Sequence, residues 1–268
     1  MLVGFSIKRK RAVIALSTVI IVFGVFWGLF FPKGEDNCNV AYIPLRGEIL
    51  TYLPPEYFTD NGALAVDSIS SEDVIGALFE AQYNDDIGAI LISVDSLGGG
   101  LVAGQEIADA VEKIEKPVVV SVGSSALSAA YYSISPADII FASQYSDIGS
   151  IAITMSYLEN VEKNKKDGLS FVELTSGKFK ESGNPDRELT FEEWQITQKQ
   201  LKDLHKLMVQ DIATKRNIPI EQLAKFADGS VLSGTEALSA GLIDKTGSIF
   251  DAIDWIQERI GRADVCWE

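Results

Sequence analysis

Two apolar runs, separated by one glycine-rich loop and one helix, constrain the fold of this chain more than any other feature. Residues 88–94 (G-A-I-L-I-S-V) and 117–122 (P-V-V-V-S-V) are almost continuously apolar, as expected of strands buried on both faces of a parallel sheet. Between them, residues 95–100 (D-S-L-G-G-G) read as a loop and residues 101–114 as a helix. Together they make one βαβ unit. Strands and helices alternate along the rest of the chain, which predicts an α/β domain with a largely parallel sheet.

The second strand leads into a turn of small residues and then into a helix that opens on Ser128, with the sequence G-S-S-A-L-S-A-A-Y-Y at 123–132. A strand, a tight turn and a helix starting at a serine expose that serine as a nucleophile. The backbone N–H of Ala129 then lies where a developing oxyanion is stabilised. The motif G-x-S-x-G is absent, however, and a serine in this setting also serves as a helix cap or a packing residue. This stretch alone therefore only nominates Ser128.

A serine nucleophile needs a base, and the choice of base is narrow here. His205 is the one histidine, and it falls in a helical stretch that favours a flank position over a catalytic triad. Lysine is the alternative base. It must be neutral, and at an unperturbed pKa near 10.4 only about one lysine in two thousand is neutral at pH 7, so burial has to lower that pKa. Lys178 and Lys180, in a polar loop at residues 175–187, are both candidates.

Charge and motifs exclude several other classes of function. The formal net charge is −15, and because residues 8–11 carry four of the cations, residues 32–268 hold 19 basic and 38 acidic residues, a net charge of −19. Such a domain repels phosphate backbones, so nucleic acid is not an expected partner. The glycine loop matches neither G-x-x-x-x-G-K-S/T nor G-x-G-x-x-G, so a nucleotide-binding site is not expected there. Cys38 and Cys266 form no C-x-x-C pair, so we expect no metal site and no cofactor; the two cysteines are either a disulfide or two thiols.

The N-terminus predicts a membrane anchor. Residues 1–11 end in four cations, and residues 12–31 contain no charge. Twenty apolar residues at 1.5 Å each span roughly the 30 Å hydrocarbon core. We interpret them as an uncleaved signal-anchor with its basic end in the cytoplasm; a cleaved signal peptide is the alternative. Residues 32–39 are then a linker, 40–262 an extracytoplasmic domain and 263–268 a tail.

Five segments resemble the signal peptide peptidase A family of serine–lysine peptidases, in the family's order and spacing, over about residues 40–260. They are V-D-S-L-G-G-G (94–100), A-L-S-A-A-Y-Y (126–132), G-S-I-A-I (149–153), T-S-G-K-F-K followed by P-D-R and a threonine (175–190), and A-D-G-S-V-L-S-G-T-E-A-L-S-A-G-L-I-D (227–244). The resemblance implies a spiral of stacked ββα units, the fold of the caseinolytic proteases and crotonases.

The resemblance also assigns roles to residues. It makes Ser128 the nucleophile and Lys180 the general base, with Lys178 the less suitable neighbour. The loop at Gly98–Gly99 and the N–H of Ala129 match the family's oxyanion-hole donors. An extended substrate adding a strand to the sheet would lie beside Gly98, Gly99, Gly100 and Leu101 on one side and Gly149, Ser150, Ile151, Ala152 and Ile153 on the other.

The implied activity is hydrolysis of peptide bonds in signal-peptide remnants and other unfolded or membrane-derived polypeptides, by a membrane-anchored homo-oligomer whose protomers share active sites. The chain departs from the family at Leu97, where proline is usual, at Ala129 and Ala130, where two glycines are usual, and at Ala152. These changes imply narrower access to Ser128. They leave open a catalytically idle scaffold of the same fold, or a related peptidase that cleaves a membrane-scaffold partner. An enzyme acting on acyl-coenzyme A is disfavoured by the extracytoplasmic location.

Overall fold

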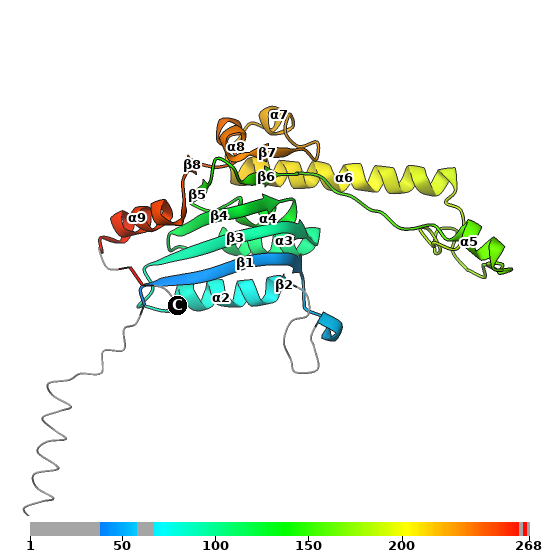
Figure 1. The fold of residues 1–268 in the computed structure, drawn as a ribbon, viewed down its shortest axis with the longest axis horizontal. Coiled ribbons are helices and arrows are strands. Elements are labelled where there is room, and N and C mark those ends of the chain that lie inside the picture. Colours follow the sequence, from blue (N-terminus) through cyan, green and yellow to red (C-terminus); the bar gives the residue numbers. More distant parts are fainter. Residues whose placement is uncertain (1–37, 58–66, 263–264, 267–268) are drawn as a thin grey trace, which may run out of the picture. The chain divides into compact units, whose positions relative to one another are not determined.

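Three long parallel strands form the centre of the protein. The computed structural model describes residues 38–57, 67–262 and 265–266. Within this part of the chain the sheet has the order β2-β1-β3-β4-β5-β8, every neighbouring pair is parallel, and β6 pairs with the second half of β4 while β7 runs antiparallel to β6 (Figure 1). The strands are β1 (Val40–Leu50), β2 (Ser68–Ser70), β3 (Ala89–Gly99), β4 (Val118–Leu127), β5 (Ile139–Ala142), β6 (Asp147–Gly149), β7 (Val231–Ser233) and β8 (Lys245–Thr246). The predicted α/β class is therefore confirmed.

The predicted membrane anchor at 12–31, the basic segment 1–11 and most of the linker 32–39 lie outside the described residues. In the part of the chain that is described, none of the helices has the length and apolar character needed to cross a bilayer.

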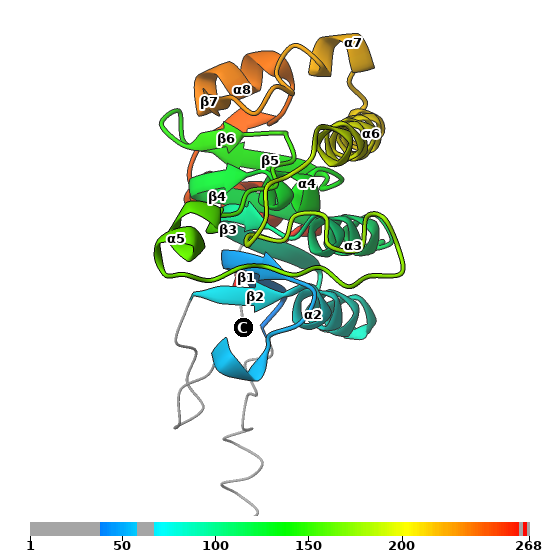
Figure 2. The same ribbon diagram turned by 90° about the vertical axis from the view of Figure 1, so that its right-hand side faces the viewer.

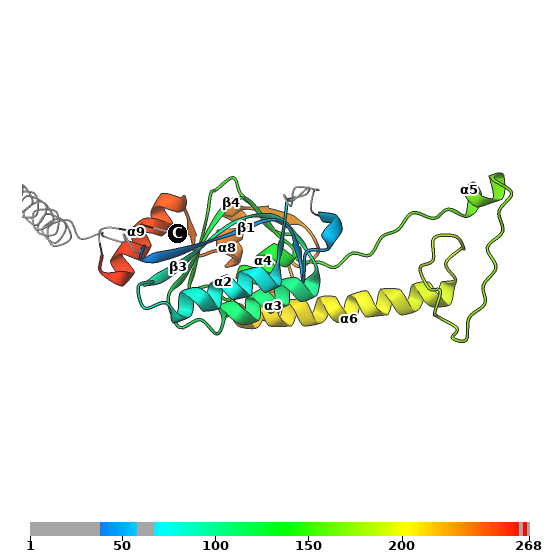
Figure 3. The same cartoon turned by 90° about the horizontal axis from the view of Figure 1, so that it is seen from below.

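Helices cover both faces of the sheet, and each face has its own apolar core. Figures 2 and 3 show α2, α3 and α6 on one side of the sheet, over the larger core. On the other face α9 packs through Ala252 and Ile256 against the first halves of the strands, at Leu91 and Val119 among others. The helices of the described residues are α2 (Ser71–Tyr83), α3 (Leu101–Val111), α4 (Ala129–Ile134), α5 (Val161–Lys166), α6 (Phe191–Lys215), α7 (Ile220–Leu223), α8 (Gly234–Ala240) and α9 (Ile249–Ile260), with a 3-10 turn at Pro55–Tyr57.

The long strands continue beyond the residues predicted from their apolar runs. The predicted loop at 95–100 is mostly strand, because β3 runs on to Gly99 and there pairs with Ile49 of β1. Likewise the sequence predicts a strand at 40–45 and a loop from Arg46 to Asp67, but β1 continues to Leu50. Irregular register between Arg46 and Glu48, and between Val94 and Ser96, carries the pairing past these polar and glycine positions.

Thr190, the pair Ser233 and Glu236, and Gly241 predict helix ends from the sequence alone, and the structure confirms them. Thr190 caps α6 in a reciprocal capping box with Glu193, and Ser233 caps α8 in the same way with Glu236. Gly241 closes α8 in the left-handed conformation, with φ +81°. At the chain's end, the carbonyl of Cys266 accepts a hydrogen bond from the N–H of Val40 (3.2 Å), and both cysteines are thiols.

Residues 154–190, here called the arm, depart most from prediction. The sequence predicts strands at 149–153 and 171–174 and a helix that ends at Lys166. In the structure the first strand ends at Gly149, the helix is limited to α5, and no strand forms at 171–174. Figures 1 and 3 show the arm running out beyond the sheet and returning to the start of α6. Most of its side chains are exposed. Among the described residues, no strand lies beside the arm for it to pair with.

Candidate active site

Ser128 stands at a strained turn between β4 and α4. Its backbone has φ +52° and ψ −123°, a conformation that non-glycine residues rarely adopt. Such a residue costs of order 1–3 kcal/mol and persists only where its surroundings over-determine it. Its N–H donates to the carbonyl of Gly149 at 2.7 Å, whereas its half-buried hydroxyl has no partner among the described residues. The predicted serine at a strand–helix junction is therefore present, and it is half-buried.

The glycine loop lies directly against this turn. Gly98 has φ +109°, and a Cβ placed on it would lie 2.9 Å from the carbonyl oxygen of Leu127 and 2.9 Å from Cβ of Ser128. The N–H of Ala129 would be 3.1 Å from the same point. The structure thus brings Gly98 and the nucleophile turn together, as predicted. The N–H of Gly98, however, donates to Oγ of Ser96 at 3.1 Å, so this donor is already engaged within the chain.

The segment that follows β6 is fixed by bonds to three different parts of the chain. Gly149 accepts from Ser128, and the N–H of Ser150 donates to the carbonyl of Ser230 at 2.9 Å. Ser150 also has a positive φ, +50°. The side chain of Ile151 is fully buried, and its carbonyl oxygen lies 3.2 Å from Nε2 of His205 in α6. Beyond Gly149 the predicted substrate-pairing strand is a tight turn.

Lys180 is not brought to Ser128 within one chain. It lies in a turn of the arm, where its N–H donates to Gly177, its side chain is exposed and its Nζ has no partner among the described residues. Lys178 forms an exposed ion pair with Glu192 (2.5 Å) and lies 5.3 Å from the ring centroid of Phe179. Figures 1 and 3 show the arm beyond the sheet, whereas Ser128 lies at the junction of β4 and α4.

Arg187, which sequence reasoning did not single out, holds the C-terminal end of the arm, where the arm joins α6. Nε of Arg187 lies 3.3 Å from a carboxylate oxygen of Glu173, and its guanidinium forms a two-point pair with the carboxylate of Glu193, which is only 3% exposed. The bonds from Arg187 and from the backbone of Thr190 lower the pKa of Glu193 to about 2. The capping box of α6 therefore also ties down the last residues of the arm.

A second charged cluster joins α6 to the helix that follows Ser128. The hydroxyl of Tyr132 in α4 donates to Asp211 of α6 at 2.5 Å. Burial of the hydroxyl, the larger cause, and this hydrogen bond both raise the pKa of Tyr132. The side chain of Lys215, one turn further along α6, is 4% exposed, and its Nζ lies within 3.1 Å of both Asp109 of α3 and Glu112, the C-cap of that helix. The spacing of Asp211 and Lys215 on one helix was the only sequence signal of this cluster. The cluster fixes the C-terminal end of α6 relative to α4.

Comparison with known proteins now adds to this geometry. The model of peptidase family S49 matches residues 110–262, more than half of the chain, including Ser128 and Lys180. This chain belongs to peptidase family S49. The Clp protease model matches residues 63–138. The S49 match thus confirms the relationship that the five sequence segments indicated.

Relatives of this S49 chain carry protease names. It is 33% identical to an inferred protease of Methanocaldococcus jannaschii over 69% of this chain and 60% of the relative. It is 27% identical to an inferred signal peptide peptidase of Enterococcus faecium, over 84% of this chain and 65% of the relative. It is 28% identical to the chloroplast serine protease SPPA of Arabidopsis thaliana, over 85% of this chain and 33% of the relative. The chain thus spans about three fifths of the first two relatives and a third of the plant protein.

A solved structure confirms the fold. A variant Clp protease from Listeria monocytogenes superimposes with a TM-score of 0.50 at 18% sequence identity, covering 81% of this chain and 95% of the other. The architecture predicted from the resemblance, an α/β fold of the Clp protease type, is therefore correct.

Proposed function

We propose that this S49 chain is a serine endopeptidase with a Ser128–Lys180 dyad, and that the two residues of each active site come from adjacent copies in a homo-oligomer. The single observation that carries this proposal is the division of the site within one chain. The strained serine turn and the glycine loop meet at the edge of the sheet, while Lys180 is exposed on the arm. A base that its own chain carries away from the nucleophile has to be supplied from another chain.

The chemistry follows from these groups. Neutral Lys180 of one copy takes the proton of Ser128 of the next, and Oγ attacks the carbonyl carbon of the scissile peptide bond. The N–H groups of Gly99 and Ala129 stabilise the oxyanion. The C–N bond then breaks, the leaving amine takes the proton from Lys180, and water hydrolyses the acyl-enzyme by the same route. Burial of Lys180 against the second copy supplies the desolvation that favours its neutral form.

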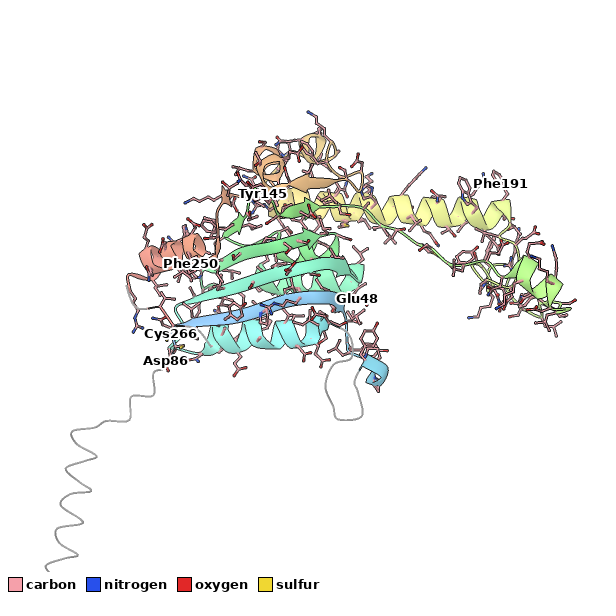
Figure 4. The ribbon with its side chains drawn as sticks, in the orientation of Figure 1. Glu48, Asp86, Tyr145, Phe191, Phe250 and Cys266 are labelled. Atoms are coloured by element: carbon pink, nitrogen blue, oxygen red, sulfur yellow. The ribbon has the colours of Figure 1, made fainter. Side chains whose placement is uncertain are left out.

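The arm and the adjoining first turn of α6 carry the apolar surface that such an assembly needs. Phe191 and Trp194 stack on one another with ring centroids 6.1 Å apart, yet they are 73% and 50% exposed, and Leu174 is 95% exposed. Figure 4 shows Phe191 at the end of α6 that is remote from the sheet. Burying aromatic and leucine side chains contributes about 1.5–3 kcal/mol each, so contact with a neighbouring copy stabilises the arm where it lies.

Substrates and location come from the sequence and the relatives' names. We propose that residues 12–31 anchor the protein in the membrane with the peptidase domain extracytoplasmic. There it would cleave signal-peptide remnants or other unfolded, membrane-derived polypeptides. The protease names of the relatives support this substrate class.

The test uses the full chain in detergent micelles and an unfolded model protein as substrate. Ser128→Ala and Lys180→Ala should each abolish cleavage while leaving the oligomer's size unchanged, and Lys178→Ala should not abolish it. Mixing the two inactive variants after dissociation and reassembly should restore about a quarter of the parent activity, because random assembly gives that share of sites both intact residues. Absence of recovery in a mixed oligomer would contradict the shared site.

One observation favours a second candidate, an idle scaffold. Leu97 is 73% exposed beside the glycine loop, and Ala129 and Ala130 both add a methyl group behind Ser128. If the intact oligomer neither cleaves unfolded proteins nor reacts with a fluorophosphonate at Ser128, these substitutions have closed the site and the scaffold function is correct.

A further inference from the structure

The one histidine of this chain contacts the segment beside the nucleophile, although the proposed mechanism does not use it. His205 is half-buried on α6, and its Nε2 lies 3.2 Å from the carbonyl oxygen of Ile151. A carbonyl oxygen only accepts, so Nε2 must carry the proton that makes this bond. Both the Nε2–H tautomer and the imidazolium satisfy it, whereas the Nδ1–H tautomer does not.

This bond completes a chain of contacts that ends at the nucleophile. The N–H of Ser128 donates to Gly149, the N–H of Ser150 donates to Ser230, and Ile151 accepts from His205. Three consecutive residues are thus each held from a different element. Two residues in this chain of contacts, Ser128 and Ser150, have φ near +50°. Strained backbone of this kind relaxes unless surrounding contacts constrain it. The bond from His205 of α6 to the carbonyl of Ile151 is one such contact.

We propose that His205 is a positioning residue for the peptidase reaction. Its bond to Ile151 keeps the 149–151 segment in place, and that segment keeps Ser128 in its strained, reactive conformation. The inference rests on the proposed function. It adds that α6, which begins where the arm ends, is coupled through His205 to the turn that presents the nucleophile.

Three substitutions separate the bond from the bulk of the side chain. His205→Gln places an amide N–H near the position of Nε2 and should keep the rate at which Ser128 reacts with a fluorophosphonate within about threefold of the parent. His205→Asn places its amide near Nδ1 instead, and His205→Leu has no donor. Both should slow acylation about tenfold, the value of one hydrogen bond of about 1–1.5 kcal/mol. With peptide substrate, kcat should fall and KM should change little. Lys206→Gln, exposed on the same helix, is the matched control and should have no effect.

A second readout does not depend on catalysis. Hydrogen–deuterium exchange of the intact chain should be faster at the amides of Ser150 and Ala152 in His205→Leu and His205→Asn, and unchanged in His205→Gln. If the parent protein neither reacts with the fluorophosphonate nor cleaves the peptide, the proposed function is wrong, and so is a positioning role for His205 in it. The exchange comparison would still report whether the bond between His205 and Ile151 exists. Equal behaviour of the glutamine and leucine variants in both assays overturns the inference. Faster exchange with unchanged acylation also overturns it, because the bond would then be structural only.

Discussion

Gly98→Ala should damage the candidate site without removing any reactive atom. The added Cβ would lie 2.9 Å from both the carbonyl oxygen of Leu127 and Cβ of Ser128, closer than real Cβ contacts allow. The φ of +109° adds strain, because side-chain-bearing residues avoid that region. Backbone strain of about 1–3 kcal/mol and overpacking of about 1–3 kcal/mol together predict a loss of about 2–6 kcal/mol in the free energy of unfolding. That is a large share of the stability of a typical domain.

Two glycines close by in the fold provide matched controls for this substitution. Gly100 has φ −66°, and the nearest atom to a Cβ there is 3.6 Å away, so Gly100→Ala should be nearly neutral. Gly76 lies in α2 with nothing within 4 Å, so Gly76→Ala should stabilise the protein by about 0.5–1 kcal/mol. Urea unfolding at one fixed protomer concentration measures all three, because the stability of an oligomer depends on concentration. Fluorophosphonate labelling of Ser128 should slow only in Gly98→Ala. If Gly98→Ala and Gly100→Ala unfold at the same urea concentration, the close approach of the loop to the serine turn is wrong.

Three further perturbations test the junction of the arm with α6 and the C-terminal end of that helix. The pKa of Glu193 falls from its ordinary 4.5 to about 2 in the folded protein. The ionised carboxylate therefore stabilises the fold fully above pH 4.5, and this contribution is lost as the pH falls through 2. The difference in unfolding free energy between the parent and Glu193→Gln should disappear over the same pH range. Lys215→Met removes a buried ammonium from three carboxylates and should lower the free energy of unfolding by about 1–3 kcal/mol in urea, whereas Lys199→Met, in an exposed pair, should change it by less than about 1 kcal/mol. Replacing Phe191 and Trp194 together by serine should leave the circular dichroism of the chain unchanged and reduce its mass in light scattering to that of a smaller assembly, and an unchanged mass would count against the arm as an interface.

Local signals predicted the helix ends after residue 190 well. The ends of α6 and α8 follow from Thr190, Ser233 and Gly241, because capping depends on residues within one helical turn. Strand ends were predicted less well. Residues 95–99 carry an aspartate and two glycines, a turn composition, yet they pair with β1 through an irregular register. That pairing depends on residues about 50 positions away, and no local pattern reports it.

The candidate site divides in the same way. The apolar run before Ser128 and the small residues after it predicted the turn, since both act within a few positions of the serine. The bond between His205 and Ile151 could not be predicted, because it joins α6 to a turn 54 residues earlier. Helical spacing assigned His205 to a flank position, and that placement is consistent with its half-buried position on α6. The spacing gave no indication of which backbone atom the imidazole would meet.

The arm shows why one error of prediction is informative. Residues 171–174 (F-V-E-L) have the composition of a strand, yet Val172 is 74% exposed and belongs to no strand in the described part of the chain. An apolar pattern reports that a segment is buried in the working protein, but it does not say in which chain its partner lies. Since Arg187 and the capping box hold the base of the arm in place, its exposed side chains are not explained by fraying of α6. The proposed contact with a second copy would account for the strand-like sequence and the exposed apolar residues, and the same contact would carry Lys180 to a serine.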